Sequence, residues 1–154
     1  MTTSHKDSNK ALLKDARMPQ VGQSVCGRYQ VNALLGVGGF AAVYRALDSK
    51  LGGEVALKVL EPSKSADEEF VQRFHQEIAL VRQLRHHNTI KIWDAGVTEH
   101  GCLYMATELI EGKELSDIIS VSAGGLGQDR LVRIATQVLR SLAEAHANQI
   151  VHRD

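Results

Sequence analysis

Short hydrophobic runs, separated by glycine-rich or polar turns, occupy much of the first two-thirds of the chain. Alternating apolar and polar positions within these runs, together with their β-compatible residues, are typical of strands. Five strands are predicted, at residues 28–37, 42–48, 54–60, 90–97 and 102–109. Glycine-containing turns are expected at residues 51–53 and 98–101.

A helical period interrupts the strands at residues 65–85. Ser65 or Asp67 can cap this helix, and the acidic residues that follow favour the positive end of the helix dipole. Its apolar face consists of Phe70, Phe74, Ile78, Val81 and Leu84. The sequence therefore predicts one amphipathic helix between the third and fourth strands.

Two further helices are expected after a linker at residues 110–113, a short one at 114–121 and a long one at 129–147. The long helix carries an apolar stripe that needs a partner surface, formed by Leu131, Ile134, Ala135, Val138, Leu142 and Ala145. The order is strands, one helix, strands, a linker and helices. This order indicates an α+β fold with segregated lobes rather than regular βαβ alternation.

The composition narrows the class of protein. Hydrophobic residues make up 44% of the chain and charged residues 23%, as in ordinary globular proteins. The 18 basic residues balance 18 acidic ones, so no net charge favours nucleic acid or an anionic membrane as a partner. No apolar run approaches the roughly 20 residues that cross a bilayer. Cys26 and Cys102 lack metal-ligand spacing and are interpreted as reduced thiols of a cytoplasmic protein.

A glycine-rich segment, Gly36-Val37-Gly38-Gly39-Phe40-Ala41, follows the first predicted strand. Closely spaced glycines let the backbone approach phosphate oxygens, although alone they also fit an ordinary hairpin turn. The pattern G-x-G-x-x-A fits a dinucleotide-binding fingerprint as well, with Glu54 near the position of a ribose-binding acid. That alternative requires a helix at residues 41–50 and leaves Lys58 without a role.

Lys58 lies in the nearly all-apolar run 54–60, on the strand face of Ala56 and Leu60. A buried ammonium needs an ion partner or an anion, whereas on an edge strand it would reach water. Glu77 lies on or beside the apolar face of the predicted helix. Two opposite charges on inward faces would satisfy each other, and the pair would hold Lys58 where it contacts ATP phosphates.

These motifs, in this order, resemble the small lobe of a eukaryotic-type (Hanks-type) serine/threonine protein kinase, most closely the bacterial members. The resemblance rests on the glycine segment with Val43, on Val55-Ala56-Leu57-Lys58, on Glu77, and on the final Val151-His152-Arg153-Asp154. It covers residues 28–154. It implies a five-stranded antiparallel sheet with one αC-type helix, followed by the first helices of a large lobe cut off at the His-Arg-Asp motif. The corresponding division is a flexible leader at 1–27, the small lobe at 28–109, and the hinge with the start of the large lobe at 110–154.

The resemblance assigns a role to each matching residue. The glycine segment 36–41 would cover the phosphates, and Val43 and Ala56 would pack on the adenine ring. Lys58 would bind the α- and β-phosphates, held by Glu77. Thr107 falls at the gatekeeper position, before a hinge at residues 108–110 that includes Glu108 and Ile110. Asp154 would be the catalytic base for the substrate hydroxyl.

The family uses ATP and Mg²⁺ to phosphorylate Ser or Thr hydroxyls of proteins, and this is the function expected here. In the family's third-glycine position this chain has Ala41. The 154 residues also contain no catalytic-loop Asn after His-Arg-Asp and no Asp-Phe-Gly segment, the family's Mg²⁺ ligands. We therefore expect the 154-residue chain to be inactive in phosphoryl transfer. The alternative is a non-catalytic nucleotide-binding or interaction module. No protein ligand for a metal is assigned within the sequence, and no nucleic acid or membrane partner is expected.

Overall fold

The computed structural model describes residues 12–122 and 125–151. The chain divides into two compact units, which are described separately. Among the described residues, the first unit comprises 12–81 and 91–109, and the second comprises 82–90 and 110–151. The main division therefore falls between Leu109 and Ile110, and the segment after the first long helix belongs to the second unit.

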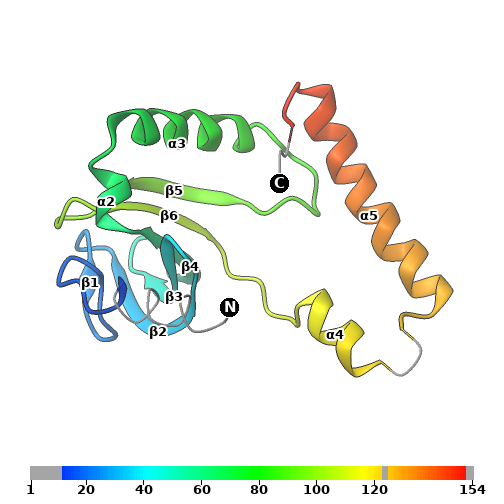
Figure 1. Ribbon diagram of the computed structural model, residues 1–154, viewed down its shortest axis with the longest axis horizontal. Helices are drawn as coiled ribbons and strands as arrows, with labels where there is room; N and C mark the ends of the chain where they lie inside the picture. Colours follow the sequence, from blue (N-terminus) through cyan, green and yellow to red (C-terminus); the bar gives the residue numbers. More distant parts are fainter. Residues whose placement is uncertain (1–11, 123–124, 152–154) are drawn as a thin grey trace. The chain divides into compact units, whose positions relative to one another are not determined.

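The first unit is built on a six-stranded antiparallel sheet (Figure 1). The strands lie in the order β1-β2-β3-β4-β6-β5, so that β4 is central and has β3 and β6 as neighbours. Their bounds are Ser24–Val25 for β1, Tyr29–Val37 for β2, Ala41–Asp48 for β3, Gly53–Leu60 for β4, Ile92–Val97 for β5 and Leu103–Glu108 for β6. The five predicted strands are thus all present within two residues of their predicted ends, and β1 is an addition at one edge.

The main core lies on one face of this sheet. Every second residue of β4 is buried there, namely Val55, Leu57 and Val59, as the alternation in the sequence predicts. Residues of neighbouring strands complete the cluster, among them Tyr29, Val31, Ala42, Tyr44, Ala46, Cys102, Tyr104 and Ala106. Cys102 is buried and Cys26 is exposed, and both thiols are free.

The described part of the predicted leader differs from the expectation, because it packs against this core. Leu12, Met18 and Val25 are all buried members of the cluster. Backbone hydrogen bonds join this segment to β2, from Gly22 N–H to the Val31 carbonyl at 2.8 Å and from Val31 N–H to the Gln23 carbonyl at 2.9 Å. Residues 12–27 therefore belong to the folded unit, whereas residues 1–11 lie outside the described residues.

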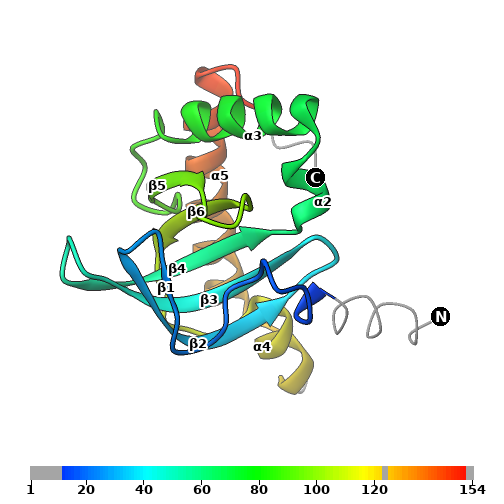
Figure 2. The same ribbon diagram turned by 90° about the vertical axis from the view of Figure 1, so that its left-hand side faces the viewer.

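The predicted helix at 65–85 corresponds to α3 at Glu68–Val81, which is shorter at both ends, and a separate short helix, α2 at Pro62–Ser65, precedes it. The break is local, because Asp67 caps α3 by accepting a hydrogen bond from Phe70 N–H at 3.1 Å. Ser65 is not the cap. Its hydroxyl oxygen accepts a hydrogen bond from Leu103 N–H at 2.8 Å, which ties α2 to β6. In Figure 1, α3 runs along β5 and β6, and Figure 2 shows it above the same two strands.

An ionic network that the sequence did not predict joins β2 to the opposite edge of the sheet. The Arg28 guanidinium donates two hydrogen bonds to the Asp48 carboxylate, at 2.9 and 2.6 Å, and a third to Asp94 at 2.8 Å. Asp94 also accepts hydrogen bonds from the hydroxyls of Tyr29 and Tyr104. Asp48 is fully buried. A buried carboxylate of this kind is tolerated only because its hydrogen-bond partners compensate for lost hydration.

The second unit contains α4 at Leu115–Val121 and α5 at Gln128–Ala147. The Glu144 side chain of α5 accepts hydrogen bonds from the N–H groups of Arg85 and His86, at 2.8 and 2.9 Å. Asn88 and Thr89 bond to Gln137 and Ser141 on the same helix. No residue of α5 is buried within the described chain, and Leu131 and Val138 of its apolar stripe are about half exposed. That this stripe needs a partner surface stays a prediction.

Replacing Arg28 by Met should destabilise the first unit by roughly 3–5 kcal/mol, because it leaves the Asp48 carboxylate buried without its cation. Urea denaturation measures the change in the free energy of unfolding. The control is Glu69→Gln, which removes a solvent-exposed pair with Arg73 on α3 and should cost less than about 0.5 kcal/mol. Equal effects of the two substitutions would contradict the role assigned to the network.

The stability of the first unit should also fall in acid. The hydrogen bonds from Arg28 hold the pKa of the Asp48 carboxyl at about 2, below its ordinary value of 3.8. The folded state therefore binds this proton more weakly than the unfolded state, so the contribution is present above pH 4 and is lost as the pH falls toward 2. Denaturation midpoints measured between pH 4 and pH 2 test whether stability falls on acidification. A midpoint that stays constant or rises on acidification would be the contrary result.

Candidate functional site

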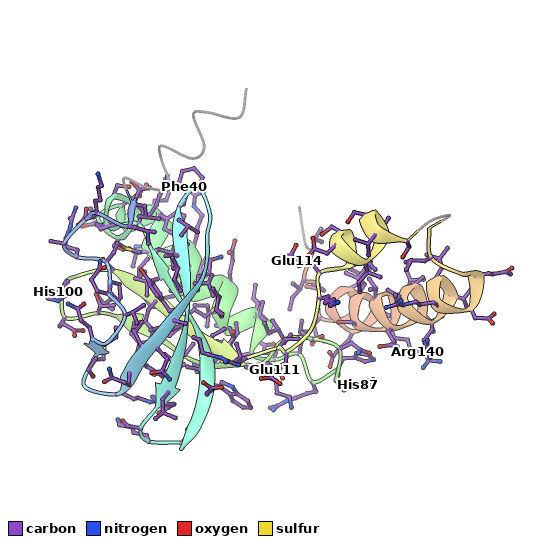
Figure 3. The ribbon with its side chains drawn as sticks, turned by 90° about the horizontal axis from the view of Figure 1, so that it is seen from below. Phe40, His87, His100, Glu111, Glu114 and Arg140 are labelled. Atoms are coloured by element: carbon purple, nitrogen blue, oxygen red, sulfur yellow. The ribbon has the colours of Figure 1, made fainter. Side chains whose placement is uncertain are left out.

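The glycine-rich segment forms a tight turn between β2 and β3. Gly36 pairs with Val43 and Val37 pairs with Ala42 in the ladder, and the turn closes with a hydrogen bond from Gly38 N–H to the Ala41 carbonyl at 2.8 Å. The Phe40 side chain lies at the tip of this turn and is 62% exposed (Figure 3). The residues from Gly36 to Ala41 therefore form one hairpin tip, called the lid below.

Two backbone donors of the lid are unpaired. Within the part of the chain that the structure describes, the N–H groups of Gly39 and Phe40 donate to no other group. An added Cβ at Gly36 or Gly39 would meet no protein atom within 4 Å, and neither residue has a positive φ. The packing and backbone of this protein therefore do not require glycine at these two positions. Consecutive free amides on such a turn are suited to an anion that approaches the backbone closely.

The side chain of Lys58 projects from the central strand onto the face opposite the main core. In the register, Lys58 lies between Val43 of β3 and Met105 of β6, and residues directly opposite one another share a face. Lys58 is exposed, while Val43 and Met105 are half-buried. The edge-strand explanation of Lys58 is excluded, because β4 is hydrogen-bonded on both sides.

The neighbouring row on the same face holds Ala56, opposite Arg45 on one side and Thr107 on the other. Ala56 is half-buried and Thr107 is buried, at 6% exposure. The Thr107 hydroxyl lies within hydrogen-bond distance of two carbonyls, Ala56 at 3.5 Å and Glu108 at 3.3 Å, and its one proton is donated to either of them. Because the side chains of Ala56 and Thr107 are small, they leave space above the sheet in the row next to Lys58.

Helix α3 covers the other end of the same face. Ala41, Leu60 and Leu103 form a second buried cluster, against which Phe70, Val71 and Phe74 of α3 pack. These contacts and the burial of Ile78 confirm the predicted apolar stripe at Phe70, Phe74 and Ile78, whereas Leu84 lies beyond the end of α3. Glu77 is exposed, beside that buried position.

The predicted pairing of Lys58 with Glu77 is not formed in this structure. No ion pair joins them, although both belong to the described residues. The prediction assumed that both charges are buried. Both side chains are exposed instead, so water solvates each of them and neither needs the other.

The hinge residues fall on both sides of the division between the units. Glu108 ends β6, where its N–H donates to the Lys91 carbonyl at 3.0 Å and its carboxylate accepts from Lys91 N–H at 2.7 Å. Ile110 belongs to the second unit and is 67% exposed. Asp154, the predicted catalytic base, lies outside the described residues.

The structure adds two residues that sequence reasoning missed, Glu61 and Lys64. The Glu61 N–H donates to the Phe40 carbonyl at 2.8 Å, and the Lys64 ammonium lies 4.9 Å from the centre of the Phe40 ring. No spacing rule links these positions to the lid, because the contact depends on how β4 leads into α2.

The dinucleotide-binding alternative is contradicted, because it requires a helix directly after the lid, whereas residues 41–48 form strand β3.

Within residues 12–122 and 125–151, no three His, Cys, Asp or Glu side chains are grouped so that they could hold a metal ion. Over the same residues, no helix combines the length and the apolar character needed to cross a membrane.

Comparison with known proteins agrees with the fold. The protein kinase domain family matches residues 29–154. Serine/threonine-protein kinase pkn3 of Myxococcus xanthus is 40% identical over 134 residues, which is 87% of this chain and 24% of that protein. PrkC of Bacillus subtilis is 39% identical over 134 residues, which is 87% of this chain and 20% of that protein.

Among solved structures, the kinase domain of Mycobacterium tuberculosis PknI matches with a TM-score of 0.76 and 29% identity. The match covers 89% of this chain and 54% of the PknI chain. The chain thus spans about half of that structure and a quarter or less of the two curated relatives. With its six-stranded sheet, its lid and Lys58 on the open face, the chain belongs to the protein kinase domain family and corresponds to the N-terminal part of a bacterial Hanks-type serine/threonine kinase domain.

Proposed function

We propose that this chain is the ATP-binding part of a protein kinase that transfers the γ-phosphate of ATP to Ser or Thr hydroxyls of proteins. The observation that carries the proposal is the placement of Lys58. Its ammonium projects from a central strand onto an open face, opposite Val43, on the strand that begins at the lid. A cation held there by two neighbouring strands has no structural partner in this protein among the described residues. It is available for an anion.

The lid supports the phosphate part of the proposal. The unpaired N–H groups of Gly39 and Phe40 are oriented by a closed turn, and the glycines leave their surroundings free of Cβ atoms. Backbone amides and a lysine ammonium together form charge-assisted hydrogen bonds with phosphate oxygens. In this role the residues from Gly36 to Ala41 cover the phosphates, and Lys58 binds the α- and β-phosphates.

The same face supports an adenine site. Val43 and Ala56 offer half-buried apolar surface, and Thr107 leaves room beside them. The hinge backbone at residues 108–110 would supply the hydrogen bonds to the adenine edge. The Glu108 N–H already pairs with Lys91, so we assign that contact to the Glu108 carbonyl and to the backbone of Ile110.

Glu77 and Asp154 complete the proposed machinery. We assign Glu77 to hold Lys58 in the phosphoryl-transfer state, which differs from the unpaired arrangement described above. We assign Asp154 to orient the substrate hydroxyl and accept its proton. Mg²⁺ would neutralise phosphate charge in this reaction. The described residues do not fit a Mg²⁺ site, since none of them form a three-ligand acidic cluster, and we assign no ligand to it.

The substrate class and the cellular site are part of the proposal. A Ser or Thr hydroxyl of a protein is favoured by the relatives, whose names describe serine/threonine kinases. Free thiols at Cys26 and Cys102 fit a reducing, cytoplasmic compartment.

A second candidate is a non-catalytic nucleotide-binding module. The separation of Lys58 from Glu77 favours it, because transfer in this family needs the pair whereas binding of ATP needs only the cation. The two candidates differ in phosphoryl transfer and agree on ATP binding.

The 154-residue chain should bind ATP, and Lys58→Met should raise the dissociation constant by roughly 10- to 100-fold, the worth of a charge-assisted contact. Isothermal titration calorimetry measures it. Glu77→Gln should change the constant by less than about twofold, because in this structure its carboxylate makes no ion pair with Lys58.

The matched control is Lys50→Met, which removes an exposed lysine from the turn between β3 and β4. This variant should bind ATP as the wild type does. NAD serves as the second ligand and should bind more weakly than ATP. Equal losses in Lys50→Met and Lys58→Met, or tighter binding of NAD, would refute the ATP site.

The same chain should transfer no measurable phosphate to itself or to a general protein substrate in the presence of Mg²⁺ and labelled ATP. The reason is that its sequence supplies neither the catalytic-loop Asn nor the Asp-Phe-Gly ligands of Mg²⁺. Incorporation of label above that of an Asp154→Asn variant would contradict this expectation.

A further inference from the structure

The lid is tied at its tip to the segment that follows β4. The carbonyl oxygen of Phe40 accepts the Glu61 N–H at 2.8 Å, at the end of the β3–β4 ladder. The Lys64 ammonium lies 4.9 Å from the centre of the Phe40 ring, within the range of a cation–π interaction. One residue of the lid is thus held both through its backbone and through its side chain.

The same ammonium also faces α3. Lys64 lies on α2 and is half-buried, and its Nζ is 5.8 Å from the centre of the Phe70 ring. Phe70 in turn packs on the second buried cluster. The cation therefore links the tip of the lid to a helix that packs on the sheet.

Burial does not hold Phe40 in place, since its side chain is 62% exposed. Without the ring contact, the Phe40 side chain would be free to rotate in water, and of the two contacts from Phe40 to the segment after β4 only the Glu61 hydrogen bond would remain. The unpaired N–H of Phe40 belongs to the same residue, so anchoring its ring and carbonyl restricts the motion of the backbone that carries this donor.

We propose that Lys64 is a positioning residue for the nucleotide: its ammonium, held against the Phe40 ring, orders the lid before ATP binds. The proposal rests on the ATP site proposed above and names a residue outside that site. Ordering the lid in the free protein removes part of the entropy cost of binding. Lys64 acts through Phe40 and is not assigned a contact with the phosphates.

The test compares Lys64→Met, which keeps the length of the side chain without its charge, with Lys64→Arg, which keeps a cation. The hydrogen exchange rate of the Glu61 amide, measured by NMR without nucleotide, reports the opening of the lid contact directly. Loss of a cation–π contact should raise this rate by about two- to fivefold in Lys64→Met. It should raise the dissociation constant for ATP by a similar factor. Lys64→Arg should restore both values, and Lys50→Met should change neither.

A double-mutant cycle separates the ring contact from simple loss of charge. In a Phe40→Leu background, Lys64→Met should have no further effect on Glu61 exchange or on ATP affinity. A loss of affinity that is as large in this background as in the wild type would overturn the proposal. So would an unchanged Glu61 exchange rate in Lys64→Met, or faster exchange with unchanged ATP affinity.

Failure of the proposal and failure of the proposed function give different results. If the wild type binds no ATP, the ATP site is refuted, while the Glu61 exchange rates still decide whether Lys64 orders the lid. If the wild type binds ATP and Lys64→Met behaves as the wild type in both measurements, only the role of Lys64 is refuted.

Discussion

The pairing of β4 with β3 on one side and β6 on the other is the constraint on which the candidate site depends. This double pairing fixes the register of Lys58 between Val43 and Met105, and it excludes an edge position for the lysine. A one-residue slip would turn Lys58 into the main core and one of its buried neighbours, such as Leu57, to the open face. The hydrophobic core on one face of the sheet therefore determines the position of Lys58 on the opposite face.

Two sets of polar contacts support this arrangement from opposite ends of the sheet. Arg28, directly before β2, binds Asp48 at the end of β3 and Asp94 of the edge strand β5 in a partly buried network, which contributes to folding and lies apart from the lid. At the other end, Asp67 caps α3, and the Ser65 hydroxyl accepts a hydrogen bond that joins α2 to β6. Phe70 and Phe74 of α3 pack on the sheet there. The lid extends from this framework as a short hairpin whose own packing does not require its glycines.

Periodicity predicted the strands well, because burial on one face imposes alternation directly on the sequence, as at Val55, Leu57 and Val59. Periodicity gave wrong predictions where the burial of a residue depends on contacts with another element of the structure. Isolated apolar residues such as Leu12 and Met18 show no period, so their burial under the sheet was missed and a leader was expected instead. The Lys58–Glu77 pair was expected from two local patterns, but whether both charges are buried depends on what covers the face. The motif order identified the family, which neither composition nor charge could do.

The central claim is that the lid and Lys58 together form a phosphate site, and the most direct measurement is an NMR titration of the chain with ATP that follows the backbone amides. The account predicts that the largest shifts occur around Lys58 and at the amides of Gly39 and Phe40, whose N–H groups have no partner among the described residues. Shifts confined to other surfaces, with these residues unaffected at saturating ATP, would contradict it.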